Sequence, residues 1–122
     1  MTHSVPALLE QFIGLYGRDT LDRWRTLFLP GFVAAATNED GSVTTWNLDQ
    51  FYERQQALFA SGKPIREVLQ NTETKLDGRL AFVGSDFVWT DGEVKRPGRL
   101  MMLIAAEHGE LKIQALSFSY AG

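Results

Sequence analysis

Cysteine is absent from this chain of 122 residues, and histidine occurs only twice. Without cysteine the chain cannot form disulfide bonds, thiolate metal sites or a cysteine nucleophile. The two histidines, His3 and His108, are remote in the sequence, so a metal site that uses both would need distant parts of the chain to meet. The glycine-rich motifs of phosphate and dinucleotide sites are also missing. We therefore expect neither a metal nor a cofactor.

Long apolar runs and clustered basic charge are missing as well. The longest apolar run, residues 100–106, is far shorter than the roughly 20 residues of a membrane helix. The first residues contain no basic segment followed by an apolar one, so no signal peptide is predicted. The formal net charge is −3, and the lysines and arginines are scattered among acids, unlike the basic surface of a nucleic-acid-binding protein. The sequence predicts a cytoplasmic protein that binds neither membranes nor nucleic acids.

The first half of the chain has the apolar spacing of amphipathic helices. Capping residues and Gly or Pro stop signals predict three helices, at residues 4–17, 19–31 and 47–62. The third opens with Asn47 and Gln50 in the spacing of a capping box. A short strand at residues 32–38 and its return at residues 42–46 separate the second helix from the third.

The second half has the turn spacing of a β-meander. Asp77-Gly78, Asp91-Gly92 and His108-Gly109 divide residues 65–120 into four strands of about ten residues each. No linker or internal repeat interrupts the chain, and its length suits one core. We expect a single domain over residues 1–122.

Side-chain alternation along these strands predicts a sheet that is apolar on both faces. Leu80, Phe82, Gly84, Asp86 and Val88 share one face, and the intervening residues share the other. Because the helices can cover only one face, we expect the second to meet another copy of the chain. The predicted homodimer has at its centre Val83, Phe87, Trp89, Met101 and Leu103.

Five short segments, in this order, resemble the SnoaL-like type of nuclear transport factor 2-like (NTF2-like) domain: Leu21-Asp22, Leu27-Phe28, Phe51-Tyr52, Asp77-Gly78, and residues 115–118. That superfamily includes ketosteroid isomerases and polyketide cyclases, and the resemblance spans nearly the whole chain. It implies an α+β, cystatin-like cone, in which three N-terminal helices pack in the concave face of a strongly curved, mostly antiparallel sheet. It also implies an apolar cavity and a dimer, but no single reaction, because one fold hosts many functions.

The resemblance does not extend to the residues of steroid isomerisation. Isomerases of this kind use a base carboxylate, a tyrosine and a protonated carboxylic acid. Carried over to this chain, those positions fall near Ala36, Phe12 and Met102, which can supply none of these groups. Steroid isomerisation is therefore not expected.

Asp86 is the candidate catalytic residue. The resemblance places its face, with Phe82 and Val88, toward the cavity, where a carboxylate among apolar side chains would have a raised pKa and could transfer protons. Two alternatives stay open: Asp86 meets a backbone amide or Arg79, or a bulge turns it to solvent.

The candidate ligand-binding residues are aromatic, amide-bearing or apolar side chains that the same comparison places at the cavity. They are Tyr16, Asn38, Trp46, Phe51, Tyr52, Phe82, Met102, Gln114 and Phe118. Other roles are open: Asn38 can begin a turn, Gln114 can bond to the backbone, and aromatic residues at helical spacing usually belong to the core. No inward arginine is evident, so epoxide hydrolysis is not expected.

The sequence thus favours a protein that binds a small apolar or carbonyl-bearing organic molecule in an internal cavity. Two alternatives remain: an isomerase, cyclase or lyase that uses Asp86 for proton transfer, and a non-catalytic dimerisation module. The sequence is compatible with an enzyme and with a protein that has no catalytic activity.

Overall fold

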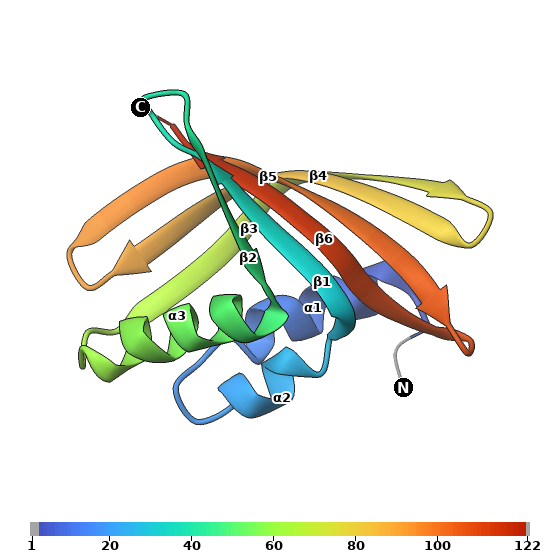
Figure 1. Ribbon diagram of the computed structural model, residues 1–122, viewed down its shortest axis with the longest axis horizontal. Helices are drawn as coiled ribbons and strands as arrows, with labels where there is room; N and C mark the ends of the chain where they lie inside the picture. The colour runs from blue at the N-terminus through green and yellow to red at the C-terminus, as the bar shows by residue number, and fades with distance from the viewer. Residues whose placement is uncertain (1–2, 122) are drawn as a thin grey trace.

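The computed structural model describes residues 3–121, in which three helices lie against a six-stranded sheet (Figure 1). The helices are α1 (Val5–Gly14), α2 (Leu21–Arg25) and α3 (Leu48–Ala60). The strands are β1 (Phe28–Thr37), β2 (Val43–Asn47), β3 (Ile65–Asp77), β4 (Leu80–Asp91), β5 (Val94–Glu107) and β6 (Glu110–Tyr120). No helix in this part of the chain is long and apolar enough to cross a membrane.

The sheet is strongly curved and has the strand order β2-β1-β6-β5-β4-β3. β1 and β6 pair in parallel, while every other pair of neighbouring strands in the described chain is antiparallel. All three helices lie on one face of the sheet (Figure 1), which we call the inner face; the opposite one is the outer face. The predicted α+β cone, with helices packed in the concave face of a mostly antiparallel sheet, is confirmed.

Local signals set the helix starts. The Ser4 hydroxyl accepts a hydrogen bond from the Ala7 backbone N–H at 3.3 Å. At α3, the backbone N–H of Gln50 donates to Asn47 Oδ1 and that of Asn47 donates to Gln50 Oε1, both at 2.9 Å. The predicted capping box is therefore present, and it satisfies two of the N–H groups that a helix start leaves unpaired.

Two helices end earlier than predicted. α1 stops at Gly14, and the Leu15 carbonyl accepts a hydrogen bond from the Thr20 hydroxyl at 2.7 Å. Tyr16 therefore lies beyond the helix. α2 stops at Arg25, and β1 begins before Pro30, where its register with β6 shifts. Such an irregular pairing tolerates a residue that lacks a backbone N–H.

The core lies between the helices and the inner face. Its centre is a group of aromatic rings from α1, α2, β1 and α3, with neighbouring centroids 4.6–6.3 Å apart: Phe12, Trp24, Phe28, Phe32 and Phe51. Trp24 is 2% exposed, and its indole N–H donates to the Phe12 carbonyl at 3.0 Å. That bond ties α2 to α1.

The predicted orientation of β4 is wrong. Ala81, Val83, Ser85, Phe87 and Trp89 point to the inner face and are buried, whereas Phe82, Gly84, Asp86 and Val88 point to the outer face. Both sets are apolar, so alternation separates them without saying which one meets the helices. Three residues of the expected dimer centre, Val83, Phe87 and Trp89, are consequently core residues. The other two, Met101 and Leu103, do lie on the outer face.

Two irregularities in strand pairing reverse the alternation of side chains, and the second turns Gln114 away from its predicted face. Opposite β4, the register of β3 shifts between Gln70 and Glu73, and Asn71 there has a φ of 53°. Opposite β5, the register of β6 shifts so that Gln114 lies between the paired residues Ile113 and Ala115. Such bulges add one residue to a strand and reverse the alternation beyond it.

Candidate functional site

A cavity of about 470 Å³ lies between the helices and the inner face. Its size falls within the range of small-molecule sites, roughly 300–1,000 Å³. Its lining comes from α1 and the residues that follow it, from α2, α3 and the β1–β2 hairpin, and from β3 to β6. The lining includes Tyr16, Asn38, Trp46, Phe51, Arg54, Gln55, Glu67, Phe87, Trp89, Arg96, Phe118 and Tyr120.

Aromatic rings form much of the wall. Trp46 on β2 stacks parallel to Phe118 on β6, with centroids 6.3 Å apart and planes 7° from parallel. Tyr120 meets Phe118 and Phe87 edge to face, at 5.9 and 5.5 Å. All three tryptophans of the chain, Trp24, Trp46 and Trp89, border the cavity. Flat, polarisable walls of this kind suit a planar or ring-bearing ligand.

A short chain of hydrogen bonds crosses one side of the cavity. The indole N–H of Trp89 donates to the Tyr16 hydroxyl oxygen at 3.1 Å, and that hydroxyl donates to Gln55 Oε1 at 2.5 Å. The indole N–H can only donate, and the Tyr16 hydroxyl gives its one proton to Gln55 Oε1. This arrangement leaves the two N–H donors of the Gln55 Nε2 amide group for other acceptors. No acceptor for them lies among residues 3–121.

Glu67 brings a carboxyl group into the same cavity. It lies on the inner face of β3, opposite Trp89, and forms no hydrogen bond or ion pair with any residue the structure describes. Burial raises the pKa of this carboxyl from its ordinary value of 4.5 to about 7, because the charged form loses hydration with nothing to replace it. Near neutral pH the group can thus accept or release a proton.

Two arginines lie where the cavity opens to solvent. The Arg54 guanidinium sits over the Trp46 ring, 5.1 Å from its centroid, and that of Arg96 sits over the Tyr120 ring at 4.0 Å. Burial raises the pKa of Tyr120, an effect opposed by Arg96 and Arg54 and reinforced by Glu67. The pKa of Tyr16 is also raised, chiefly by burial. Both arginines and Glu67 therefore act on the same tyrosine.

Five predicted ligand-binding residues border the cavity: Tyr16, Asn38, Trp46, Phe51 and Phe118. The other four do not. Tyr52 packs under the Arg25 guanidinium, 4.8 Å away, and Met102 is buried in the core. Phe82 lies on the outer face because β4 has the opposite orientation, and Gln114 is exposed because it occupies a bulge.

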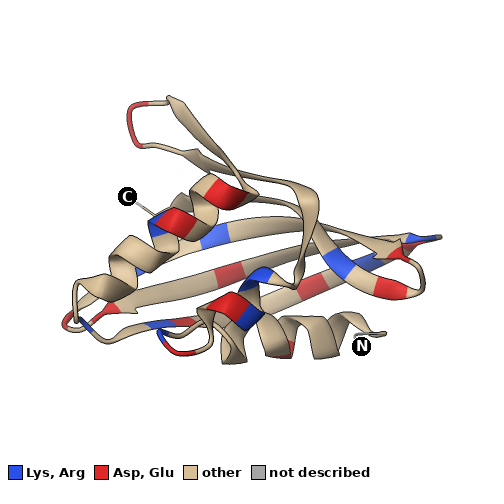
Figure 2. Ribbon diagram, turned by 60° about the horizontal axis from the view of Figure 1, so that its bottom comes forward, with Lys and Arg blue, Asp and Glu red and all other residues tan. Residues whose placement is uncertain are grey.

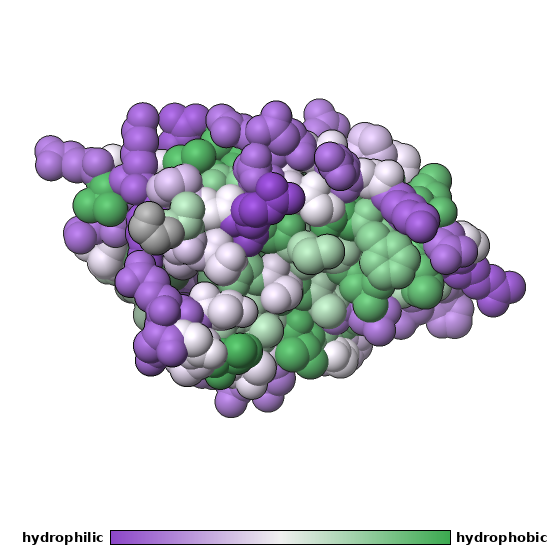
Figure 3. Space-filling model, turned by 90° about the horizontal axis from the view of Figure 1, so that it is seen from above, coloured by the Kyte–Doolittle hydropathy of each residue, from purple (hydrophilic) through white to green (hydrophobic). Residues whose placement is uncertain are grey.

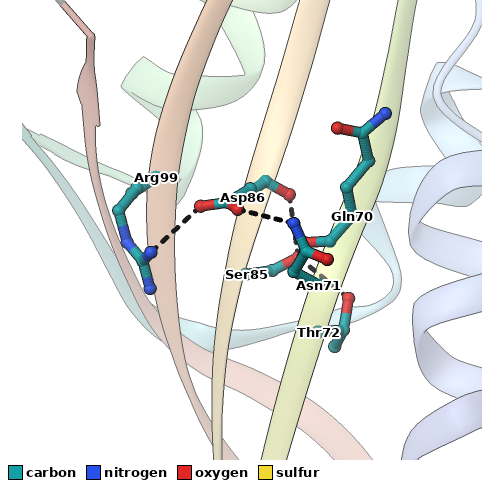
Figure 4. Close-up of polar contacts among 6 residues, drawn as sticks. All are labelled: Gln70, Asn71, Thr72, Ser85, Asp86 and Arg99. Carbon is teal, nitrogen blue, oxygen red and sulfur yellow. Dashed lines mark hydrogen bonds and ion pairs between the residues drawn. The ribbon is translucent and has the colours of Figure 1, made fainter.

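Asp86 does not face the cavity. It lies on the outer face, where Arg99 Nη1 approaches its Oδ1 at 3.0 Å and Asn71 Nδ2 donates to its Oδ2 at 2.9 Å (Figure 4). On the other side of the strand the Ser85 hydroxyl bonds to the Gln70 carbonyl and the Thr72 hydroxyl. The expectation of an inward, desolvated Asp86 is therefore wrong: the carboxylate is partly exposed and paired with an arginine.

Among the polar cavity residues that sequence reasoning missed are Glu67, Gln55, Arg54 and Arg96, and the first two had a visible signal. Glu67 interrupts the apolar alternation of Ile65 and Leu69 on β3. Gln55 falls on the buried stripe of α3, between Phe51 and Phe59. Arg54 and Arg96 had no such signal because both residues are exposed, so the expectation that no arginine faces the cavity is also wrong.

The remaining charges form no obvious metal or polyanion site. Basic and acidic residues are interspersed over the helices and strands in Figure 2. His3 Nδ1 lies 3.0 Å from the Gly109 carbonyl oxygen, so the N-terminal segment does approach the turn that contains His108. Even so, no three histidine, aspartate or glutamate side chains gather into a possible metal site within residues 3–121.

Neither a family model nor a curated protein sequence matches this chain. Solved structures do match it. A Novosphingobium aromaticivorans protein, assigned as the β subunit of an aromatic-ring-hydroxylating dioxygenase, is 13% identical, with a TM-score of 0.77 and coverage of 97% of this chain and 87% of that chain. An NTF2-like protein of unknown function from Silicibacter pomeroyi is 12% identical, with a TM-score of 0.75 and coverage of 96% and 92%.

A Nostoc punctiforme protein of unknown function with a cystatin-like fold is 10% identical, with a TM-score of 0.73 and coverage of 99% of this chain and 96% of that chain. The chain has an NTF2-like fold. At these identities the likeness shows the fold alone, which is the fold that the resemblance of the sequence motifs implies. Within the NTF2-like fold, the helix-covered inner face holds the cavity described above.

Proposed function

We propose that this protein binds a small, ring-bearing organic molecule in its inner cavity and holds a carbonyl oxygen of that molecule with the Gln55 amide. The observation that carries the proposal is the hydrogen-bond chain from Trp89 through Tyr16 to Gln55. It fixes the amide so that its two N–H donors are unused by the described protein groups. A ligand that fills the cavity displaces water from these donors, so an acceptor on the ligand is needed to replace the lost hydrogen bonds.

The shape and chemistry of the wall support the same class of ligand. The cavity is bordered by parallel and edge-on rings, which favour a flat apolar body. Polar side chains, among them Gln55 and Glu67, lie between these rings, and well-placed polar groups fix the orientation of a ligand. Because helices cover the inner face, we expect the ligand to enter at the open end of the cavity, near Asn38 and Tyr120.

Binding of benzylacetone and of butylbenzene, measured by titration calorimetry, tests the proposal. The two compounds share a phenyl ring and a similar length, but only benzylacetone has a carbonyl. We expect benzylacetone to bind at least tenfold more tightly than butylbenzene. This ratio corresponds to a difference of about 1.4 kcal/mol in binding free energy, which is the contribution of one well-made hydrogen bond in a buried site.

Gln55→Met should remove that preference, because methionine keeps the volume and loses the amide donors. Gln56→Met is the matched control, since Gln56 is the exposed neighbour on α3. Equal affinity of wild-type protein for the two compounds, or a Gln55→Met variant that keeps the preference, would refute the role of the amide. Absence of binding by both compounds at millimolar concentration would refute the function itself.

We also propose that two copies of the chain associate through the outer face. Its exposed apolar residues support this: Met101 is 66% exposed and Phe82 is 42% exposed. Figure 3 shows hydrophobic residues gathered on this face within a polar surround. A shallow depression there is lined by both, together with Glu73, Lys75 and Arg99. Because charges of both signs share the face, a two-fold related copy can match them.

A further inference from the structure

We propose that the ligand of the cavity is a ring-bearing carboxylic acid whose carboxylate is held at the opening by Arg54 and Arg96. This inference rests on the proposed function and adds the charge of the ligand to it. Of the described residues that line the cavity, four carry ionisable charge: Glu39, Arg54, Glu67 and Arg96. Their arrangement decides which ligands the site admits.

Neither arginine has a carboxylate partner among residues 3–121. The salt bridges that the described residues form are Arg25–Asp49 and Arg99–Asp86, and both lie outside the cavity. Arg54 and Arg96 instead lie over the faces of Trp46 and Tyr120. Stacking on a ring uses the flat face of a guanidinium and leaves the N–H groups at its edge available. Each arginine thus keeps its donors for a ligand.

One ring links the positions of the two arginines. Arg54 of α3 lies over Trp46 and Arg96 of β5 lies over Tyr120, and Phe118 contacts both of these rings, at 6.3 and 5.9 Å between centroids. Planar guanidinium groups presented from two elements around one ring match a carboxylate, which can accept paired hydrogen bonds from either. Glu39 belongs to the exposed turn after β1 and forms no ion pair within residues 3–121, so it does not neutralise them.

Glu67 is compatible with an anionic ligand. Burial raises its pKa to about 7, so near neutral pH a large fraction of the molecules carry an uncharged carboxyl group at this position. In that form it adds no negative charge to the cavity and can donate a hydrogen bond. The charge that a ligand meets at the opening is therefore set mainly by the arginines.

The test compares phenylpropanoate with phenylpropanamide. Both have a phenyl ring, the same chain and a carbonyl oxygen, but only the first is charged at neutral pH. All three tryptophans border the cavity, so intrinsic tryptophan fluorescence reports binding. We expect phenylpropanoate to bind at least tenfold more tightly than the amide at low ionic strength, with the difference shrinking as salt is added.

The arginine variants separate charge from shape. Arg54→Gln and Arg96→Gln should each weaken phenylpropanoate binding at least fivefold and leave phenylpropanamide binding unchanged. Arg66→Gln is the matched control, since Arg66 is an exposed arginine on the outer side of β3. Its substitution should affect neither compound.

The outcomes distinguish this inference from the function on which it rests. If the amide binds as tightly as the acid, or if the arginine variants weaken both compounds equally, the carboxylate inference is overturned while ligand binding stands. If phenylpropanoate, phenylpropanamide and benzylacetone all fail to bind, both proposals are overturned.

Discussion

Glu67 lies at a position that destabilises its charged form. Its carboxyl group is buried in the cavity and no residue among 3–121 pairs with it, so burial raises its pKa. The titratable and charged groups around it are Tyr16 after α1, Arg54 on α3, Arg96 on β5 and Tyr120 on β6. None of them bonds to it, which is typical of a functional site rather than a structural one.

The first prediction concerns the stability of Glu67→Gln. An acid whose pKa is higher in the folded than in the unfolded state destabilises the fold as the pH rises from the unfolded value to the folded one. The free energy of unfolding of the variant should therefore rise relative to that of wild type between about pH 4.5 and about pH 7. The difference should reach roughly 1–3 kcal/mol and stay constant at higher pH. Urea denaturation at several pH values measures this. Glu73→Gln, on the exposed outer side of β3, should show no such trend.

The second prediction concerns Tyr16→Phe. The change removes one oxygen and leaves both the Trp89 indole N–H and Gln55 Oε1 without their partner. We expect a loss of about 1–3 kcal/mol in the free energy of unfolding and weaker benzylacetone binding, because Gln55 is no longer oriented. Tyr52→Phe should be nearly neutral, since the Tyr52 hydroxyl has no hydrogen-bond partner within residues 3–121. A Tyr16→Phe protein as stable as wild type would contradict the hydrogen-bond chain.

At the same scale, the sequence indicates which aromatic residues border the cavity better than which polar ones do. Tyr16, Trp46, Phe51 and Phe118 could be named because periodicity groups large side chains on one side of an element, and the family resemblance implies a cavity there. Asp86 was misplaced because alternation cannot orient a strand that is apolar on both faces. In the sequence, Gln55 is a single polar residue on the apolar stripe of α3. Its place in the cavity follows from its hydrogen bond with Tyr16, a contact that only the three-dimensional structure shows.

At the scale of elements, the helix starts and strand ends follow from local chemistry. The sequence correctly predicts the helix caps at Ser4 and Asn47. It also correctly predicts the three Gly-containing turns that join β3 to β4, β4 to β5 and β5 to β6. The bulges at Asn71 and Gln114 could not be predicted, because they depend on how strands distant in the sequence pair. The same holds for the parallel pairing of β1 with β6.

The third prediction belongs to the packing of β4, β5 and β6. Gly98 on β5 lies so close to its neighbours that a methyl group there would overlap the Ser119 carbonyl oxygen and the Phe87 ring. Gly98→Ala should therefore cost roughly 1–3 kcal/mol and displace Phe87 from the cavity wall. Gly84→Ala is the control, since a methyl group there meets nothing within 4 Å. Thermal melting of both variants is the measurement. Equal melting temperatures would contradict the close approach.

At the scale of the whole molecule, the proposed association through the outer face gives the fourth prediction. Met101→Glu places a charge in the exposed apolar part of that face and should shift the protein from dimer to monomer, because a buried unpaired charge is costly. Val43→Glu, on the exposed edge strand β2, should leave the dimer unchanged. Sedimentation equilibrium at micromolar concentration distinguishes the two. A wild-type protein that is monomeric under these conditions would refute the association.

The cavity itself is best tested by tryptophan fluorescence during a titration with benzylacetone, in wild-type protein and in Ala36→Phe. Ala36 borders the cavity from β1, so a phenyl ring there fills it while the outer surface stays the same. A binding site in the cavity predicts a saturable change with one ligand per chain in wild type and none in the variant, with both proteins folded by circular dichroism. Equal saturation of the two proteins would place the ligand elsewhere and contradict the account.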